Sequence, residues 1–135
     1  YYKYLNNKFD DILFVTDNPY SPIFNILNKN MSYEIQSTSL IKDLNTLISA
    51  KNLASSGVGT FITSAALLSK ELETFYFSNF YLSRHLNPEM LEGSVSKIKI
   101  NLKKFPPFNS WKQDISKINQ HLSSETEFTI ENLIN

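Results

Sequence analysis

The stretch Ala54-Ser55-Ser56-Gly57-Val58-Gly59-Thr60-Phe61 decides how this chain is expected to fold. The chain has three glycines, and two of them, Gly57 and Gly59, lie in this stretch. Residues 52–55 before the glycines predict a short strand, and residues 60–69 after them predict a helix. A turn from a strand into a helix presents N–H groups that lack intrahelical partners, and the helix dipole adds positive potential there. Because glycine also lets the backbone approach a ligand closely, the stretch predicts a site for a phosphate-bearing ligand.

A purely structural interpretation of the same stretch stays open beside this one. Small residues at a strand-to-helix turn also serve the turn itself and the packing of the helix on the sheet. The stretch matches neither a complete G-x-G-x-x-G motif nor a G-x-x-x-x-G-K-[ST] motif. The glycine turn alone therefore does not separate a ligand site from a packing feature.

The composition is that of a globular chain without excess charge. The chain has 135 residues, of which 41% are hydrophobic and 13% aromatic, enough for one domain with a core. Lys and Arg number 13, as do Asp and Glu, so the formal net charge is zero. This balance argues against a general nucleic-acid or membrane-surface binder. Cysteine is absent, which excludes a disulfide framework, thiolate metal ligands and a thiol nucleophile.

The sequence carries no targeting or membrane-spanning pattern. No apolar run approaches the roughly 20 residues that a membrane span needs, and no signal peptide is visible. The chain begins at Tyr1 without a methionine and ends at Ile134-Asn135, where the pattern fits a short helix. We therefore expect a fragment of a longer protein. The compartment stays open: cytoplasmic for a bacterial or viral protein, the Golgi or endoplasmic reticulum lumen for a eukaryotic one.

Apolar patterns predict strands and helices that alternate along the chain. The predicted strands are Ile12–Val15, Tyr33–Gln36, Asn52–Ser55 and Glu73–Phe77. The predicted helices between them cover residues 22–28, 39–50 and 60–69. This alternation indicates an α/β fold, a Rossmann-like parallel sheet with helices on both faces. We expect a single domain over residues 1–135, with a ligand-binding core at 11–78 and a C-terminal extension at 79–135.

Two of these helices carry apolar faces at helical spacing. The face of the helix at 39–50 consists of Leu40, Ile41, Leu44, Leu47 and Ile48. The helix at 60–69 is expected to turn Phe61, Ala65 and Leu68 inward. One of Ser37, Thr38 and Ser39 is expected to cap the first helix. In the extension, residues 94–102 predict a strand and residues 110–122 a helix.

Polar residues follow two of the predicted strands. Asp17-Asn18 follows the first strand, and Ser55-Ser56-Gly57 follows the third. Asp43 lies in or near the first turn of the intervening helix. In a parallel sheet the ligand crevice lies beyond the carboxyl ends of the strands. We therefore expect these three groups to converge at one edge of the sheet.

Two runs resemble elements of a known family. They are Ile12-Leu13-Phe14-Val15-Thr16-Asp17-Asn18-Pro19 and Asp43-Leu44-x-x-Leu47-Ile48-x-Ala50-Lys51-x-Leu53-x-Ser55-x-Gly57-x-Gly59-Thr60-Phe61. The first is similar to the strand followed by Thr-Asp-Asp/Asn of GDP-fucose-dependent fucosyltransferases. The second is similar to their next element, in which an Asp opens a helix and a Ser/Thr-rich turn before an aromatic residue starts another. The resemblance covers Asp11 to Phe77, roughly half the chain, and implies the C-terminal, nucleotide-binding half of a GT-B glycosyltransferase.

The resemblance also implies roles for particular residues. Asp17 and Asn18 would lie near the nucleoside, and Asp43 would accept hydrogen bonds from the N1–H and N2–H₂ groups of guanine. The diphosphate would be held by the turn, whose residues are Ser55, Ser56, Gly57, Gly59, Thr60 and Phe61. The donor would be GDP-fucose or another nucleotide-sugar, and the sugar would pass to a hydroxyl of a glycan or other acceptor. No metal cofactor is expected, and no catalytic residue is identified.

One motif of that family is missing from the chain. The family binds phosphate with a His-x-Arg-Arg motif, whereas the only arginine here is Arg84, in Ser83-Arg84-His85 after the glycine turn. Either the motif lies upstream of Tyr1 in the full protein, or the activity is absent or different. A non-catalytic or degenerate α/β interaction domain is therefore the alternative. Another phosphate-ligand enzyme of the Rossmann or flavodoxin type is a third interpretation, although no glycine fingerprint follows the first strand.

Overall fold

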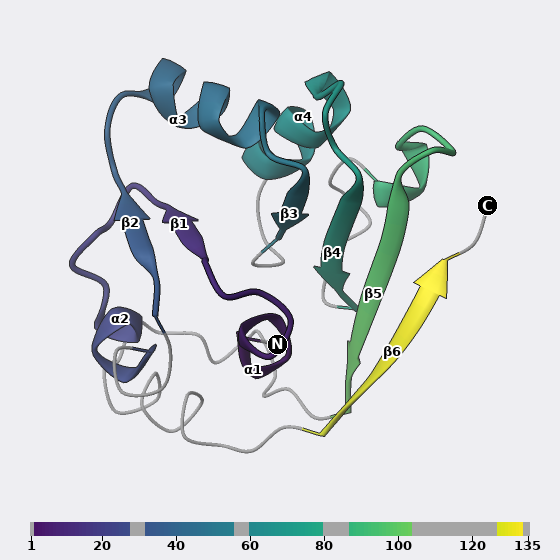
Figure 1. The fold of residues 1–135 in the computed structure, drawn as a ribbon, viewed down its shortest axis with the longest axis horizontal. Coiled ribbons are helices and arrows are strands. Elements are labelled where there is room, and N and C mark those ends of the chain that lie inside the picture. Colours follow the sequence, from purple (N-terminus) through teal and green to yellow (C-terminus); the bar gives the residue numbers. More distant parts are fainter. Residues whose placement is uncertain (1, 28–31, 56–59, 80–86, 104–126, 134–135) are drawn as a thin grey trace. The chain divides into compact units, whose positions relative to one another are not determined.

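The protein is described by a computed structural model that covers residues 2–27, 32–55, 60–79, 87–103 and 127–133. Its fold class is α/β, with mostly parallel strands flanked by helices (Figure 1), compatible with a Rossmann-like half-domain as predicted. The chain divides into two compact units: Tyr1–Thr38 with Lys103–Glu127, and Ser39–Leu102 with Phe128–Asn135. The predicted helix at 110–122, Arg84 and both histidines lie outside the described residues.

The first unit contains a two-stranded parallel sheet. Its elements in chain order are α1 (Tyr2–Asn6), β1 (Leu13–Val15), α2 (Pro22–Leu27) and β2 (Glu34–Gln36). Phe14 of β1 lies opposite Ile35 of β2. The N–H of Thr16 donates to the carbonyl of Gln36 over 3.0 Å, which carries the pairing one residue beyond β1.

Aromatic side chains form the interior of this first unit. The ring of Phe14 lies 5.7 Å from that of Tyr2, 5.5 Å from Phe24 and 5.3 Å from Tyr33, measured between centroids. The Tyr33 hydroxyl donates to the Phe24 carbonyl over 2.9 Å, so its polar end is satisfied within the cluster. Burial raises the pKa of Tyr2 above its usual 10.0, because the phenolate would lose its hydration there.

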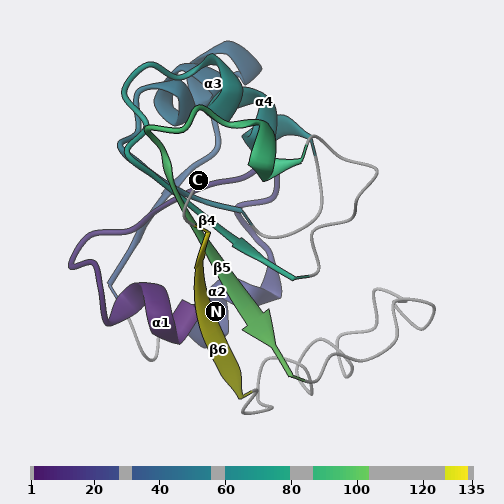
Figure 2. The ribbon, with the colours of Figure 1, turned by 90° about the vertical axis from the view of Figure 1, so that its right-hand side faces the viewer.

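The second unit contains a four-stranded mixed sheet (Figures 1 and 2). In spatial order its strands are β3 (Asn52–Ala54), β4 (Thr74–Ser78), β5 (Ser96–Leu102) and β6 (Phe128–Leu133). The first three are parallel, and β6 runs antiparallel to β5. The unit also contains α3 (Leu40–Ile48), α4 (Phe61–Leu68) and the 3₁₀ turn η1 (Pro88–Met90). None of the described helices is long and apolar enough to span a bilayer.

The strand β4 forms the centre of the core of the second unit. Phe75 has no exposed surface, Tyr76 on the opposite face is 1% exposed, and Phe77 is buried as well. The rings of Phe75 and Phe77 stack with centroids 6.0 Å apart. A strand covered on both faces needs an uninterrupted apolar run, which is why three aromatic residues follow one another here.

Two predictions about strands are corrected by the structure. The four strands predicted for one sheet pair as two sheets, β1 with β2 and β3 with β4, among the described residues. Residues 128–133 form the strand β6 where a short C-terminal helix was expected; Ile134 and Asn135 lie outside the described residues. Phe128 and Ile130 alternate with Thr129 and Glu131, which is the period of a strand, and β5 supplies the partner edge.

The inward faces of two helices are also corrected. In α4, Ala65 is buried as predicted, but Phe61 is 39% and Leu68 61% exposed. In α3, Leu47 alone of the predicted apolar face is buried, and Leu40 and Ile41 are largely exposed. On both helices, fewer of the apolar residues are buried than their helical spacing predicts.

Candidate functional site

The candidate site is the edge of the second unit's sheet at which the parallel strands end. Because β3, β4 and β5 run the same way, their carboxyl ends meet at one edge, the usual position of ligand crevices in such sheets. Ser55 follows β3, Asn79 follows β4, and β5 ends at Leu102. The order from β3 through α4 to β4 is a parallel βαβ unit.

Ser55 is the first residue of the predicted phosphate-binding turn. It has no exposed surface, and its N–H donates to the Tyr76 carbonyl over 2.9 Å. This bond continues the pairing of β3 with β4, so the N–H of Ser55 serves the sheet. The next residues of the predicted site, Ser56, Gly57 and Gly59, lie outside the described residues.

Thr60 and Phe61 mark the start of α4. Thr60 is the N-cap residue, but its backbone is in the right-handed helical region and its side chain makes no capping hydrogen bond. The carbonyl of Thr60 accepts the first helical bond, from the N–H of Ser64 at 2.9 Å. A typical N-cap hydroxyl accepts from the second or third N–H of the helix. The first N–H groups of α4 therefore receive nothing from the Thr60 hydroxyl, an arrangement that suits an external acceptor.

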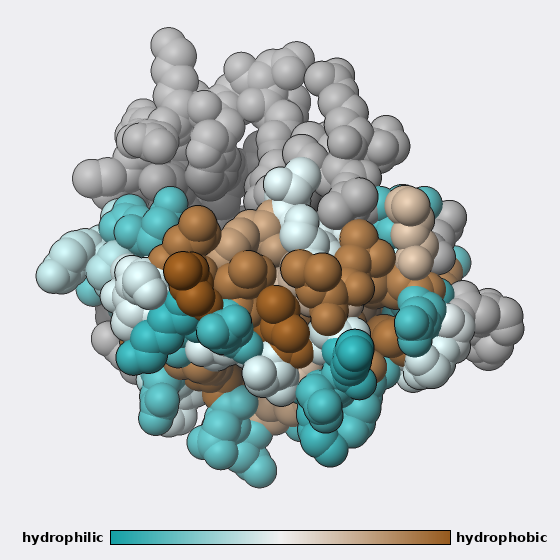
Figure 3. Space-filling view, turned by 90° about the horizontal axis from the view of Figure 1, so that it is seen from above, coloured by the Kyte–Doolittle hydropathy of each residue, from teal (hydrophilic) through white to brown (hydrophobic). Residues whose placement is uncertain are grey.

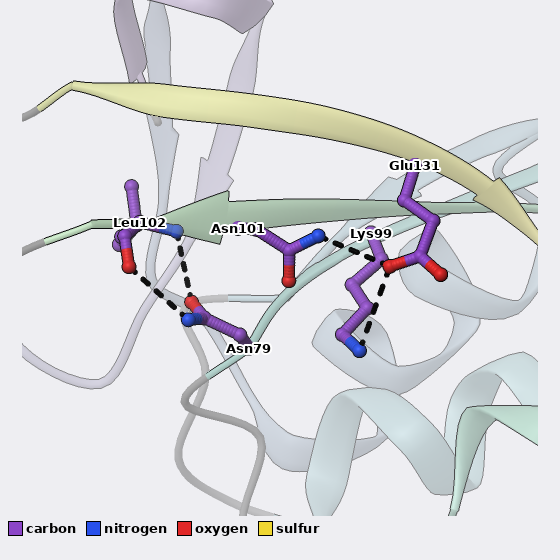
Figure 4. A network of polar contacts seen from close by, with 5 residues as sticks. All are labelled: Asn79, Lys99, Asn101, Leu102 and Glu131. Carbon is purple, nitrogen blue, oxygen red and sulfur yellow. Dashed lines mark hydrogen bonds and ion pairs between the residues drawn. The ribbon is translucent and has the colours of Figure 1, made fainter.

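Asn79 joins the ends of β4 and β5 at the candidate site (Figure 4). Its side-chain Nδ2 donates to the carbonyl of Leu102 over 3.2 Å, and its Oδ1 accepts from the N–H of Leu102 over 3.0 Å. Its own N–H donates to the carbonyl of Ile100 over 3.2 Å. The amide thus imitates one more residue of the β4 strand and holds the edge of the sheet together.

A second polar group links β5 to β6 (Figure 4). The Glu131 carboxylate accepts a hydrogen bond from Asn101 Nδ2 over 3.0 Å and lies 3.7 Å from Lys99 Nζ. Lys99 and Glu131 are direct partners in the register of the two strands. Such cross-strand pairs contribute little each when exposed, but they favour one register over its neighbours.

Replacing Asn79 with alanine is expected to lower the free energy of unfolding by about 1 kcal/mol, because two exposed hydrogen bonds to Leu102 are lost. Urea unfolding followed by circular dichroism measures this change. Asn132→Ala, exposed on β6, is the matched control and is expected to change stability by less than about 0.5 kcal/mol. Equal losses of stability in the two variants would contradict the role of Asn79 in joining β4 to β5.

Asp43 lies in the first turn of α3. It is half-buried, and its N–H donates to the Ser39 carbonyl over 2.9 Å. Ser39 caps this helix by accepting from the Lys42 N–H over 3.3 Å, which confirms one of the three predicted caps. A carboxylate in the first turn also complements the helix dipole, so Asp43 has a structural reason for its position besides the predicted contact with guanine.

Asp17 and Asn18 lie after β1, in the first unit. Both are exposed. The N–H of Asn18 donates to Thr16 Oγ1 over 3.1 Å, and its carbonyl accepts from the N–H of Ser21 over 3.2 Å. These bonds shape a turn between β1 and α2. Since Asp43 and Ser55 belong to the second unit, the convergence of the three polar groups stays a prediction.

Sequence reasoning missed three polar positions of the second unit. Asn79 was detectable as an amide that follows a predicted strand by two residues, a signal like the one that singled out Asn18. Thr63 has no exposed surface, and Lys97 is 2% exposed. No local signal distinguishes these two from exposed residues, because their burial depends on the elements packed around them.

Within the part of the chain that the structure describes, no group of three His, Cys, Asp or Glu side chains is placed to hold a metal ion. Comparison with models of known protein families, with curated proteins and with solved structures found no match to this chain. The features that bear on function are the sheet edge, the residues between β3 and α4, and the resemblance of the two sequence runs.

Proposed function

We propose that the second unit binds a nucleotide-sugar at the turn between β3 and α4, with GDP-fucose or a relative as the donor. The unit would serve a glycosyltransferase reaction that transfers the sugar to a hydroxyl acceptor. The diphosphate would accept hydrogen bonds from N–H groups of the turn and of the first turn of α4, which attract anions through the helix dipole. Asp43 would accept from the guanine edge.

The observation that carries this proposal is the βαβ unit from β3 to β4. A six-residue connection, Ser55 to Thr60, separates the end of β3 at Ala54 from the start of α4 at Phe61. Two of its residues are glycines, and the Thr60 hydroxyl does not cap the first N–H groups of α4. A strand, a glycine-containing connection and a helix start in this order are the parts from which phosphate sites are commonly built.

The experiment that tests the proposal compares GDP, UDP, ADP and NAD by isothermal titration calorimetry on the 135-residue chain. GDP is expected to bind most tightly. Asp43→Ala is expected to weaken GDP at least about tenfold more than UDP, because uracil does not present the paired N1–H and N2–H₂ donors of guanine. Circular dichroism checks that α3 survives the substitution.

The outcomes separate the parts of the proposal. Equal weakening of GDP and UDP by Asp43→Ala would contradict the contact with the base. A preference for UDP in the wild type would exclude GDP-fucose as donor while keeping a nucleotide-sugar site. Absence of binding by all four nucleotides to a folded chain would contradict a self-sufficient phosphate turn.

A non-catalytic interaction domain is the second candidate function. The observation in its favour is the exposure of large apolar side chains on the second unit, among them Leu40 at 71% and Ile41 at 72%. Apolar groups of this size in water favour association with a partner. The lack of the basic phosphate-binding motif in this chain agrees with the same alternative.

A further inference from the structure

The helix α4 carries large apolar residues on its outer side as well as small ones on its inner side. Its sequence, Phe-Ile-Thr-Ser-Ala-Ala-Leu-Leu, contains no charged residue. The inner side is formed by the small residues Thr63, Ala65 and Ala66, which are buried. On the outer side Phe61, Leu67 and Leu68 are 39%, 40% and 61% exposed. Large apolar side chains that gather on an exposed side mark a contact surface, so the outer side of α4 calls for a partner.

The helix α3 has an apolar arc that is wider than its buried side. Leu47 points inward and is buried, whereas Leu44 and Ile48 are half-buried. At its first turn Leu40 and Ile41 remain mostly exposed. The spacing of these five residues defines one continuous stripe, and only part of that stripe is used inside the second unit.

The exposed sides of the two helices form a single surface. α3 and α4 lie side by side in both ribbon views (Figures 1 and 2), and the Ser69 hydroxyl, just after α4, donates to the carbonyl of Ile48 at the end of α3. Viewed from the end where these helices lie, apolar residues gather in a broad band (Figure 3). We name the exposed large apolar residues of the two helices the α3–α4 surface: Leu40, Ile41, Phe61, Leu67 and Leu68.

The size of the α3–α4 surface matches one half of a small dimer interface. If a fully exposed large side chain presents about 200 Å², the five residues present on the order of 600 Å². This reaches the upper end of the patches found on monomeric proteins, about 300–600 Å². Two copies of the surface would bury about 1,200 Å² together, the lower limit for a specific interface.

The charges around the surface also suit a second copy of the chain. None of its five residues is charged, and the exposed residues next to it along the chain carry both signs: Lys42 after Ile41, and Lys70 and Glu71 after α4. The chain as a whole has a formal net charge of zero. A surface with a single sign of charge would repel its own copy across a two-fold axis, whereas this one would not.

We propose that the chain forms a homodimer with two-fold symmetry through the α3–α4 surface, so that the helix pair of one copy packs on that of the other. The proposed dimer supplies a partner for the non-catalytic interaction domain considered above. It does not depend on nucleotide binding. The interface is symmetric, with the same residues buried on both copies. Interfaces at the low end of the size range are typical of weak, transient complexes, so the dimer is expected to form at micromolar concentrations of the chain.

Sedimentation velocity of the 135-residue chain from about 1 to 200 µM tests the proposal. The mass is expected to rise with concentration from 15.6 kDa toward twice that value. Ile41→Glu and Leu68→Glu each place a charge in the apolar interface and are expected to raise the dissociation constant at least about tenfold. Both side chains are largely exposed within one copy, so the fold is expected to survive, as circular dichroism checks.

Tyr20→Glu is the matched control, because Tyr20 is 92% exposed and lies in the first unit; it is expected to leave the dissociation constant unchanged. A wild-type chain that stays monomeric at all concentrations would overturn the proposal. So would a dimer that survives both Ile41→Glu and Leu68→Glu, since another surface would then hold it. Titration of GDP into Ile41→Glu separates the two ideas: retained nucleotide binding with lost dimerisation supports the dimer surface as an independent feature.

Discussion

Replacing Phe75 with alanine is expected to unfold the second unit under conditions in which the wild type is folded. The side chain has no exposed surface, lies on the central strand β4, and stacks on Phe77 at 6.0 Å. Removing a buried phenyl ring costs about 3–5 kcal/mol, since apolar burial is lost and a cavity remains. Domains of this size have a total stability of about 5–15 kcal/mol. One substitution therefore removes a large part of the free energy of unfolding.

Urea unfolding followed by far-ultraviolet circular dichroism measures this loss. Phe128→Ala is the matched control, because the same ring on the edge strand β6 is 36% exposed; it is expected to cost about 1 kcal/mol. If Phe75→Ala destabilised the chain no more than Phe128→Ala, the position of β4 at the centre of the core would be wrong.

Replacing Gly59 with valine is expected to weaken nucleotide binding at least about a hundredfold. Under the proposed function the backbone of the turn after β3 approaches the diphosphate, and a branched side chain at this position would occupy the space of the phosphate oxygens. The fold is expected to persist, because Gly59 comes in the sequence between the end of β3 at Ala54 and the start of α4 at Phe61. Calorimetry with GDP measures the affinity, and circular dichroism measures the fold.

Val58→Ala tests the specificity of this effect within the same turn. It shortens a side chain beside the glycine without adding atoms near the backbone, so the GDP affinity is expected to stay within about threefold of the wild type. Retained affinity in Gly59→Val would contradict the phosphate turn. A large loss in Val58→Ala as well would point to a general disturbance of the turn.

The local elements of this fold could be predicted from short sequence patterns. The apolar run at 12–15 predicts a strand and contains β1, Leu13–Val15. The stretch 39–50 predicts a helix and contains α3, with Ser39 as its cap. Strands and helices of this kind depend on the spacing of apolar residues and on capping bonds within a few positions. The parallel α/β class followed from their alternation.

Such local patterns could not predict which strands pair or which side chains of a helix are buried. Residues 128–133 form a strand because they pair with β5, which is distant from them in the sequence. The packing of α3 and α4 decides that Leu40, Ile41 and Leu68 stay exposed while the small Ala65 is buried. Asn79 gains its role only because β5 brings Leu102 beside it.

The sequence accordingly sufficed for features that depend on neighbours along the chain, namely the elements and one cap, while the ligand site at the glycines stays a prediction. Burial, strand order and the α3–α4 surface depend on contacts between residues far apart in the chain. One apolar stripe on a helix is compatible with several directions of packing, and apolar burial has no directional preference of its own. Which side of the helix packs inward is therefore decided only by the tertiary structure.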